Sequence, residues 1–457
     1  MTARSPDPSS AGVNPHPADA GQPLGKIAPQ PWMSSPAVRS VLNALTAGGN
    51  DVRFIGGCVR DAAAQRTVRD VDLAIALPPD RVLGLLQAAG VKAIPTGIEH
   101  GTVTAVVGSE HVEITTLRKD VETDGRHAKV AFIGDWRADA ARRDLTINAM
   151  SCTPEGDVYD YFGGLDDLAR GRIRFVGDAD VRITEDALRL LRFFRFYAEF
   201  GRPPPDDDAL AACRRHAPAM RRLSSERVRS ELLRLLMAED PAAVLHLMRD
   251  NGVLDVVLPE AGALARLDKL CWLDSRALAR PTVAADAVRR LASLIDGGAG
   301  DADAVAGRLK LSNVDRQRLT TIAGPPFAPS PDTPALVVDR TLHRTGQAHT
   351  RDRALISWAD ELARGGGGGR GGRTNAWRAL LDRIDAWRAV AFPLHGRDAL
   401  ALGVPPGPRV GWLLDRVERW WEDGGYRADR EQCLDHLRMA IDQTADGSDG
   451  KAGDSPA

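Results

Sequence analysis

The sequence predicts an α+β domain near the N-terminus, followed by a region that is helical throughout. Strand-like and helix-like patterns alternate between about residues 50 and 120, as expected for an α/β or α+β domain. Strand patterns stop near residue 180, and helical patterns broken by proline and glycine follow. The chain has 457 residues, which is too long for one ordinary hydrophobic core and predicts two to four domains.

Each predicted element of the first domain has its own sequence signal. Residues 70–77 (DVDLAIAL) read as a buried strand. Residues 78–90 open with two prolines and end at Gly90, which predicts a helix. Two further strands are predicted at 101–108 and 111–117, joined by a short turn at residues 108–110. Before all of these, residues 51–57 (DVRFIGG) read as a strand that meets a tight turn.

The composition limits the class of protein. The chain is 43% hydrophobic and 27% charged, which is typical of a soluble globular protein. No apolar run is long enough to span a bilayer, and the N-terminus lacks the pattern of a secretion signal, so we expect a cytoplasmic protein without a membrane partner. The net charge of -2 means that any surface for nucleic acid must be local. The five cysteines form neither a disulfide framework nor a zinc pattern.

Two aspartates are the first candidates for chemistry. Asp70 and Asp72 flank Val71, and residues two apart on a strand point to the same face. Two carboxylates held close together repel each other unless a cation neutralises them, and Mg²⁺ is the cation that suits carboxylates and a triphosphate. A surface turn with two solvated aspartates is the alternative.

The residues before these aspartates favour the chemical reading. Gly56, Gly57 and Arg60 directly follow a strand, where backbone N–H groups and a guanidinium can approach phosphate oxygens. A glycine turn followed by two paired aspartates is more specific than either feature alone. Glu113, on a later strand, is either a third carboxylate across the sheet or a polar residue of an edge strand.

Several motifs, in order along the chain, resemble those of the tRNA nucleotidyltransferase/poly(A) polymerase family of the bacterial and eukaryotic class, within the DNA polymerase β superfamily. They are GGCVRD with RDVDLAI, DGRHAKVAF (124–132), RRDLTINAM (142–150), YDYFGGLDDL (159–168), EDALRLLRFFRF (185–196) and SSERVRSELL (224–233). Together they cover about residues 50–235. Residues 396–414 are also similar to the C-terminal part of many bacterial members.

The resemblance implies a domain organisation, with a polymerase β-like head. We expect a disordered tail (1–35), a nucleotidyltransferase head (36–180), a helical neck (181–240), a helical body (241–395) with a glycine-rich loop at 365–372, a helical tail domain (396–445) and a disordered end (446–457).

The resemblance also implies an activity, which is template-independent addition of C, C and A to the 3′ end of tRNA from CTP and ATP. Asp70 and Asp72 would hold the metal ions, with Glu113 as a further catalytic candidate. The residues implied to bind the nucleotide are Gly56, Gly57, Arg60, Arg143, Asp144, Asp186, Arg189 and Arg192.

Asp186 and Arg189 are implied to read the incoming base. We expect them to share one face of a helix capped by Thr184, where an acceptor and a set of donors can satisfy the edge of cytosine or adenine. The alternative is an ordinary ion pair between these two residues, with a second between Glu185 and Arg189.

Other activities of the same family remain open. Poly(A) polymerases share the head motifs, but residues 99–108 (EHGTVTAVVG) resemble the CCA-adding kind. Enzymes that add only CC typically lack the segment that resembles residues 124–132, whereas addition of A alone is not distinguished. A non-catalytic RNA-binding protein on the same scaffold is expected to have lost Asp70 or Asp72. The oligomeric state is not predicted.

Overall fold

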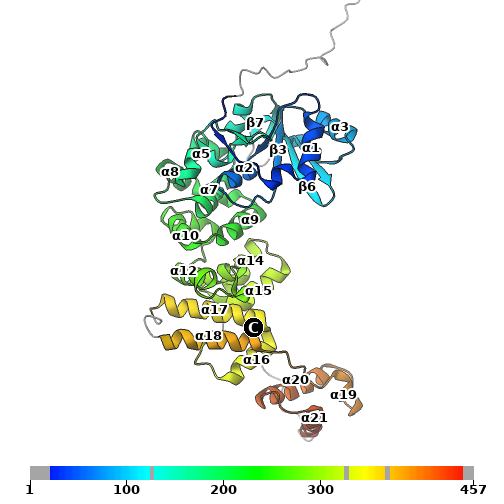
Figure 1. Ribbon diagram of the computed structural model, residues 1–457. Coiled ribbons are helices and arrows are strands. Elements are labelled where there is room, and N and C mark those ends of the chain that lie inside the picture. The colour runs from blue at the N-terminus through cyan, green and yellow to red at the C-terminus, as the bar shows by residue number, and fades with distance from the viewer. Residues whose placement is uncertain (1–20, 124–127, 324–328, 366–370, 446–457) are drawn as a thin grey trace, which may run out of the picture.

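The protein is elongated, with a sheet-containing head at one end and helices stacked away from it (Figure 1). The computed structural model describes residues 21–123, 128–323, 329–365 and 371–445. The strands are β1 (Gly25–Lys26), β2 (Val52–Ile55), β3 (Val71–Ile75), β4 (Lys92–Gly97), β5 (Thr102–Val107), β6 (Glu110–Thr116), β7 (Arg118–Thr123), β8 (Ala128–Phe132), β9 (Ser151–Cys152) and β10 (Asp157–Tyr159). The helices of the head are α1 (Pro36–Thr46), α2 (Gly57–Ala63), α3 (Pro79–Ala88), α4 (Trp136–Ala141) and α5 (Gly164–Arg170).

Helices make up the rest of the described chain. They are α6 (Ala179–Glu185), α7 (Leu188–Phe200), α8 (Asp207–His216), α9 (Ser225–Leu236), α10 (Pro241–Asp250), α11 (Leu254–Val257), α12 (Leu264–Trp272), α13 (Ala287–Leu294), α14 (Gly298–Arg308), α15 (Asn313–Ala323), α16 (Ala335–Thr345), α17 (Gln347–Ala363), α18 (Gly371–Ala386), α19 (Gly396–Ala401), α20 (Pro408–Asp423) and α21 (Arg430–Ala445). The prediction of an α+β head followed by an all-helical region is confirmed.

The head is built on a mixed sheet of eight strands in the order β1-β10-β9-β2-β3-β6-β5-β4. Only the β3–β6 pair is parallel, because α3, β4 and β5 intervene in the chain before β6 returns beside β3. The strands predicted at 51–57, 70–77, 101–108 and 111–117 are all present, as β2, β3, β5 and β6. The predicted helix at 78–90 is also present, as α3.

The predicted tail at residues 1–35 is wrong for residues 21–35. Gly25 and Lys26 pair with β10, and the side chains of Ile27 and Met33 are buried in the core of the head. Ser35 then accepts a hydrogen bond from the backbone N–H of Val38 at 3.3 Å and so caps α1. The composition suggested a tail because a few apolar residues among prolines give no periodic pattern. The tail residues 1–20 lie outside the described part, as do the predicted end at 446–457 and residues 366–370 of the glycine-rich loop.

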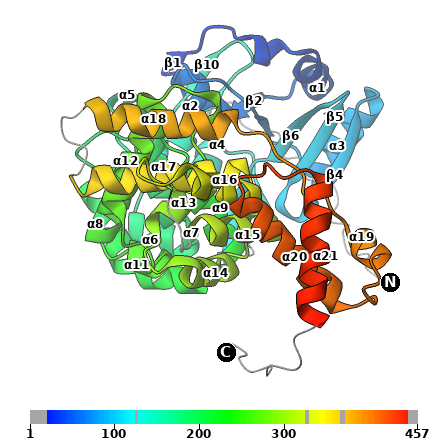
Figure 2. The ribbon, with the colours of Figure 1, turned by 90° about the horizontal axis from the view of Figure 1, so that it is seen from below.

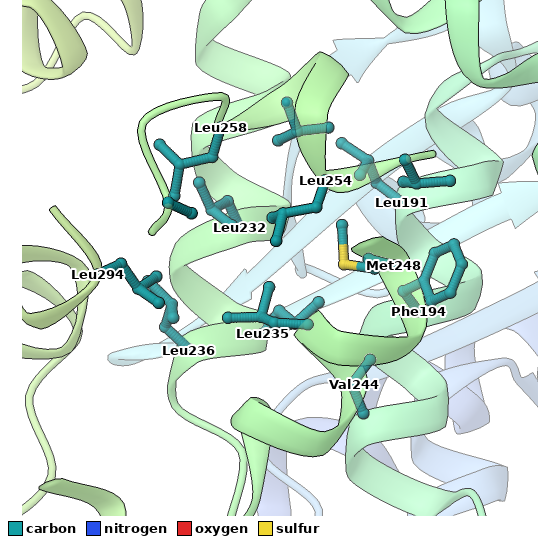
Figure 3. Close-up of a cluster of buried hydrophobic side chains, with 14 of the residues drawn as sticks. Leu191, Phe194, Leu232, Leu235, Leu236, Val244, Met248, Leu254, Leu258 and Leu294 are labelled. Atoms are coloured by element: carbon teal, nitrogen blue, oxygen red, sulfur yellow. The ribbon is translucent and has the colours of Figure 1, made fainter. Parts of the chain in front are cut away.

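One hydrophobic cluster joins the head to the first helices beyond it. Leu145 and Phe175 of the head pack with Phe193 on α7, and the rings of Phe175 and Phe193 stack with centroids 5.7 Å apart. The cluster continues through α9 and α10, as Figure 3 shows for Leu232, Leu235, Leu236, Val244 and Met248. Because it extends to Ile322, the boundary expected between residues 240 and 241 falls inside one packed core.

Two further clusters stabilise the C-terminal half. One joins α12, α16, α17 and α18, where Trp358 and Trp377 stack with ring centroids 5.7 Å apart. The other joins α19, α20 and α21 around Trp421. Figure 2 looks along the stack and shows α20 and α21 set off to one side of α12, α13 and α17. Within the described residues, no helix has the length and apolarity needed to cross a membrane.

Substitution of Met33 tests whether residues 21–35 belong to the core. Met33→Ala removes a buried side chain and is expected to destabilise the head by about 2–5 kcal/mol. Leu24→Ala is the matched control, because Leu24 is 67% exposed and its loss is expected to cost less than about 0.5 kcal/mol. The two variants are compared by urea unfolding followed by circular dichroism. Equal midpoints for both would contradict the packing of this segment.

Candidate active site at the head–neck junction

Strand β3 and its neighbour β6 bring three carboxylates together. Asp70 directly precedes β3, and Asp72 is the second residue of that strand. Asp72 is paired in register with Glu113 on β6. Since β6 lies between β3 and β5, Glu113 is not on an edge strand, and that alternative is wrong. The sheet thus places Glu113 beside the predicted metal-binding pair.

The charge on this group of carboxylates is only partly balanced by nearby cations. Burial, the negative charge of Glu113 and that of Asp70 raise the pKa of Asp72 to about 6, although Arg143 acts in the opposite direction. Within the described part of the chain, neither Asp70 nor Asp72 forms an ion pair, and neither carboxylate accepts a hydrogen bond. A carboxylate pair of this kind is favourable only when a cation is supplied.

The donor set fits a divalent cation that is shared with a substrate. Among the described residues, no three His, Cys, Asp or Glu side chains form a complete metal-binding group. Asp70 and Asp72 can supply two oxygen ligands, and oxygen atoms of a bound phosphate and water can supply the others. Glu113 affects the charge of Asp72 without completing a three-carboxylate site.

The glycine turn lies against the arginine of the second motif. Gly56 ends the loop before α2 with φ 68°, a left-handed conformation that favours glycine. A Cβ at Gly56 would lie 3.2 Å from Nη1 of Arg143, so the missing side chain also makes room for that guanidinium. Gly57 begins α2, and Arg60 lies one turn further along that helix. The structure therefore brings Gly56, Gly57, Arg60 and Arg143 together.

Asp144 joins the head to α7. Its Oδ2 accepts a hydrogen bond from Nε of Arg192 at 2.6 Å, and its Oδ1 accepts from the backbone N–H of Leu145 at 2.9 Å. Burial would raise the pKa of Asp144, but the charge of Arg192 and these hydrogen bonds outweigh it and lower the pKa. The carboxylate of Asp144 therefore becomes protonated only at a lower pH than an ordinary aspartate does, so its lowered pKa favours the charged form that pairs with Arg192.

Asn148 connects the two predicted phosphate-binding segments and was not found from the sequence. Its Oδ1 accepts a hydrogen bond from Nη1 of Arg60 at 2.7 Å, and its Nδ2 donates to Oδ1 of Asp144 at 3.1 Å. Asn148 is buried, so both of its polar groups need partners. The signal available in the sequence was its place four residues after Asp144 in the motif RRDLTINAM.

The structure corrects the expectation for Asp186 and Arg189. They do not lie on one helix capped by Thr184: α6 ends at Glu185, Asp186 has an extended backbone with φ -154°, and α7 begins at Leu188. Oδ1 of Asp186 accepts a hydrogen bond from the backbone N–H of Leu188 at 3.1 Å, which helps to start α7. The periodicity of apolar residues does not reveal a break between two helices when apolar residues continue across the break.

The ion pairs of these residues also differ in part from expectation. Arg189 pairs with Glu185, as one alternative predicted, and its Nη2 donates to the backbone carbonyl of Arg142 at 3.0 Å. Asp186 pairs with Arg227 of α9 at 2.6 Å rather than with Arg189. Both candidates therefore lie at the junction of head and neck, and Arg227 is a contributor that the sequence did not reveal.

The unbalanced charge at Asp72 predicts pH-dependent binding of a divalent cation. A cation competes with a proton for the carboxylate, so affinity for Mn²⁺ in the absence of nucleotide should fall up to about tenfold per pH unit below pH 6. Calorimetric titrations between pH 5 and 8 measure this directly, and Asp72→Asn should abolish the dependence. An affinity that stays constant over this range in the unchanged protein would contradict the assignment.

Comparison with known proteins agrees with this architecture. Residues 52–174 match the model of the poly A polymerase head domain. Residues 205–264 match the model described as the probable RNA and SrmB-binding site of polymerase A. The chain is 32% identical over 417 residues to the CCA tRNA nucleotidyltransferase 1, mitochondrial, of Homo sapiens, which covers 88% of this chain and 89% of that protein.

Two further relatives support the same assignment. The CCA-adding enzyme of Streptococcus sanguinis is 37% identical over 237 residues, which is 51% of this chain and 58% of that protein. The crystal structure of the Bacillus stearothermophilus CCA-adding enzyme in complex with CTP superposes with a TM-score of 0.69 and 26% identity, over 90% of this chain and 99% of that one. On these grounds the chain belongs to the tRNA nucleotidyltransferase/poly(A) polymerase family.

Proposed function

We propose that the protein adds C, C and A to the 3′ end of tRNA from CTP and ATP without a nucleic-acid template. The observation that carries this proposal is the junction of head and neck: Arg143 lies against Gly56 and acts on the charge of Asp72, and Arg189 of α7 donates to the backbone carbonyl of the adjacent Arg142. The relatives from Homo sapiens and Streptococcus sanguinis carry CCA addition in their names. Residues 99–108 resemble the corresponding segment of CCA-adding enzymes. They include the end of the connection between β4 and β5, and β5 itself.

In the proposed reaction, the 3′-hydroxyl oxygen of tRNA attacks the α-phosphorus of CTP or ATP, and the bond to pyrophosphate breaks. The divalent metal of this family, which we propose to be Mg²⁺, would lower the pKa of the hydroxyl and neutralise charge on the triphosphate. Asp70 and Asp72 would hold it. Arg60, Arg143 and the backbone N–H groups after Gly56 would stabilise charge on the phosphates.

We propose that Asp186 and Arg189 select the base. Each already forms an ion pair in this structure, Arg189 with Glu185 and Asp186 with Arg227. These pairs hold the carboxylate and the guanidinium in defined positions while both keep further hydrogen-bonding capacity. Asp144 of the head and Arg192 of α7 would help to position Asp186 and Arg189 through their own hydrogen bond.

The cellular location is a separate proposal. We propose a cytoplasmic protein, supported by five buried cysteines that form no disulfide, which suits any reducing compartment. Fractionation of the native host with an antibody to the chain tests this, and recovery with an organelle would contradict it.

Replacement of Asp70 tests the metal assignment. Asp70→Ala should lower nucleotide transfer by about 10³-fold or more, because a lost metal ligand removes several kcal/mol of transition-state stabilisation. Asp80→Ala is the matched control, since Asp80 is an exposed aspartate in the first turn of α3. The assay uses tRNA that ends at the discriminator base, with product length read on a sequencing gel.

The same gel separates the alternatives of the family. Three added nucleotides with CTP and ATP, and two with CTP alone, are expected. A long ladder with ATP alone would identify a poly(A) polymerase, and a single A added only to tRNA that already ends in CC would identify an A-adding enzyme. Normal transfer by Asp70→Ala would contradict the metal assignment.

Replacement of Arg189 tests base selection. Arg189→Ala should reduce the preference for CTP and ATP over UTP and GTP by about 10–100-fold, since a hydrogen bond from a charged group contributes about 1.5–3 kcal/mol. Arg182→Ala is the control, because Arg182 pairs with the same Glu185 at 2.6 Å and is not proposed to read the base. The measurement is the ratio of kcat/KM values for the four nucleotides. An equal loss for all four in Arg189→Ala would argue against base reading.

A further inference from the structure

A cavity of about 560 Å³ lies between head and neck, beside the segment that leads into β3. The loop that leads into β3 lines one side through Arg66 and Arg69, and α2 contributes Arg60. The end of α7 and the C-terminal part of α9 line the other side, through Phe200, Arg234 and Met237. Arg60, a candidate nucleotide-binding residue, lines this cavity, and Arg69 directly precedes Asp70, so the cavity borders the candidate active site.

The lining carries an excess of positive charge. Four arginines face two carboxylates, Asp61 and Glu199, and both carboxylates already have partners. Asp61 pairs with Arg60 at 2.8 Å, and Glu199 pairs with Arg195 at 3.0 Å. The acidic groups of the cavity are therefore neutralised from within the fold, and the remaining charge is available to an anion.

Arg69 and Arg234 stand out among the arginines of this region. Both are exposed, and neither forms an ion pair or a side-chain hydrogen bond within residues 21–123, 128–323, 329–365 and 371–445. By contrast, Arg227 on the same helix as Arg234 pairs with Asp186, and Arg192 and Arg195 on α7 pair with Asp144 and Glu231. Two unpaired guanidiniums that line one cavity are suited to bind phosphate groups.

The apolar part of the lining indicates a ligand larger than a free phosphate ion, with an apolar portion of its own. The guanidiniums of Arg60 and Arg66 lie over the ring of Phe200 at 4.8 and 4.0 Å from its centroid. Met237 is 48% exposed and adds apolar surface to the same lining. The cavity therefore combines apolar side chains with guanidinium groups. This lining and this volume suit a nucleotide with its phosphate, because the base and ribose make apolar contacts.

We propose that this cavity holds a nucleotide of the tRNA acceptor strand near its 3′ end, with Arg69 and Arg234 as positioning residues that bind backbone phosphates. The inference rests on the proposed function and goes beyond it by naming where the RNA strand is held. Binding at Arg69 fixes the strand next to Asp70, so that the 3′-hydroxyl is presented to the carboxylate site. The partner class is RNA, recognised through phosphate and without sequence readout.

The test compares Arg69→Ala, Arg234→Ala and Arg81→Ala in the full chain. Arg81 is the matched control, because it is exposed on α3 and lies outside the cavity lining. For tRNA without CCA, KM should rise about tenfold to a hundredfold in each cavity variant, while KM for CTP stays within about twofold, since each variant removes one charged hydrogen bond to phosphate. Arg234→Lys keeps the charge and should recover most of the lost affinity.

The salt dependence of tRNA binding distinguishes a phosphate contact from a purely structural role, because a structural role would leave it unchanged. The slope of log Kd for tRNA against log salt, from filter binding, should fall by about 0.7 in each cavity variant, the value for one phosphate contact on a single strand. The slope of Arg81→Ala should equal that of the unchanged protein. An unchanged slope and unchanged KM for tRNA in both cavity variants would overturn the proposal.

Pyrophosphate inhibition distinguishes RNA from a small anion. If the cavity instead binds the leaving pyrophosphate, the cavity variants would raise its inhibition constant and KM for CTP while KM for tRNA stays the same, and the proposal would be wrong. Failure of the proposed function looks different, because the unchanged protein would then add no nucleotide to tRNA at all. Filter binding would still show whether Arg69 and Arg234 bind RNA.

Discussion

The hydrogen-bonded ion pair between Asp144 and Arg192 connects the two halves of the candidate site. Asp144 belongs to the head and Arg192 to α7, and their atoms Oδ2 and Nε are 2.6 Å apart. Through Asn148, the same carboxylate is linked to Arg60 and the glycine turn. Loss of Arg192 would leave a buried carboxylate short of a partner, at a cost of about 1.5–3 kcal/mol. The head groups proposed to bind the nucleotide and the neck groups proposed to read the base therefore share one support.

Apolar packing and charge pairing act together at this junction. The cluster around Leu145, Phe175 and Phe193 continues from the head into the neck helices, so that α7 cannot shift without exposing apolar surface. Most arginines there have acidic partners. Charge is left unbalanced at two neighbouring places: the carboxylates of β3 are negative, and the cavity at Arg69 and Arg234 is positive. These are the places where a cation and a phosphate backbone would complete the electrostatic balance.

The local features of the fold were predicted from the sequence, and the non-local ones were not. The strands predicted at 51–57, 70–77, 101–108 and 111–117 and the helix at 78–90 follow from periodicity and from proline and glycine, whereas β4 was not predicted. The pairing of Asp72 with Glu113 depends on strand order, which no local pattern encodes. Likewise, the break at Asp186 and the partner Arg227 depend on how α6, α7 and α9 pack. The aspartates and the glycine turn came from residue types and spacing, and the other candidate site residues came from a resemblance of motifs. Asn148 and the basic cavity emerged only from side-chain contacts.

A double-mutant cycle on Asp144 and Arg192 tests most directly whether one support serves both halves of the site. The rate constant kcat/KM for CTP addition is measured in Asp144→Ala, Arg192→Ala and the double variant. If the residues act through each other, the double variant loses about as much as the more damaging single one, with a coupling of about 1.5–3 kcal/mol. Losses that simply add would show that each residue acts on the nucleotide separately and would contradict this account.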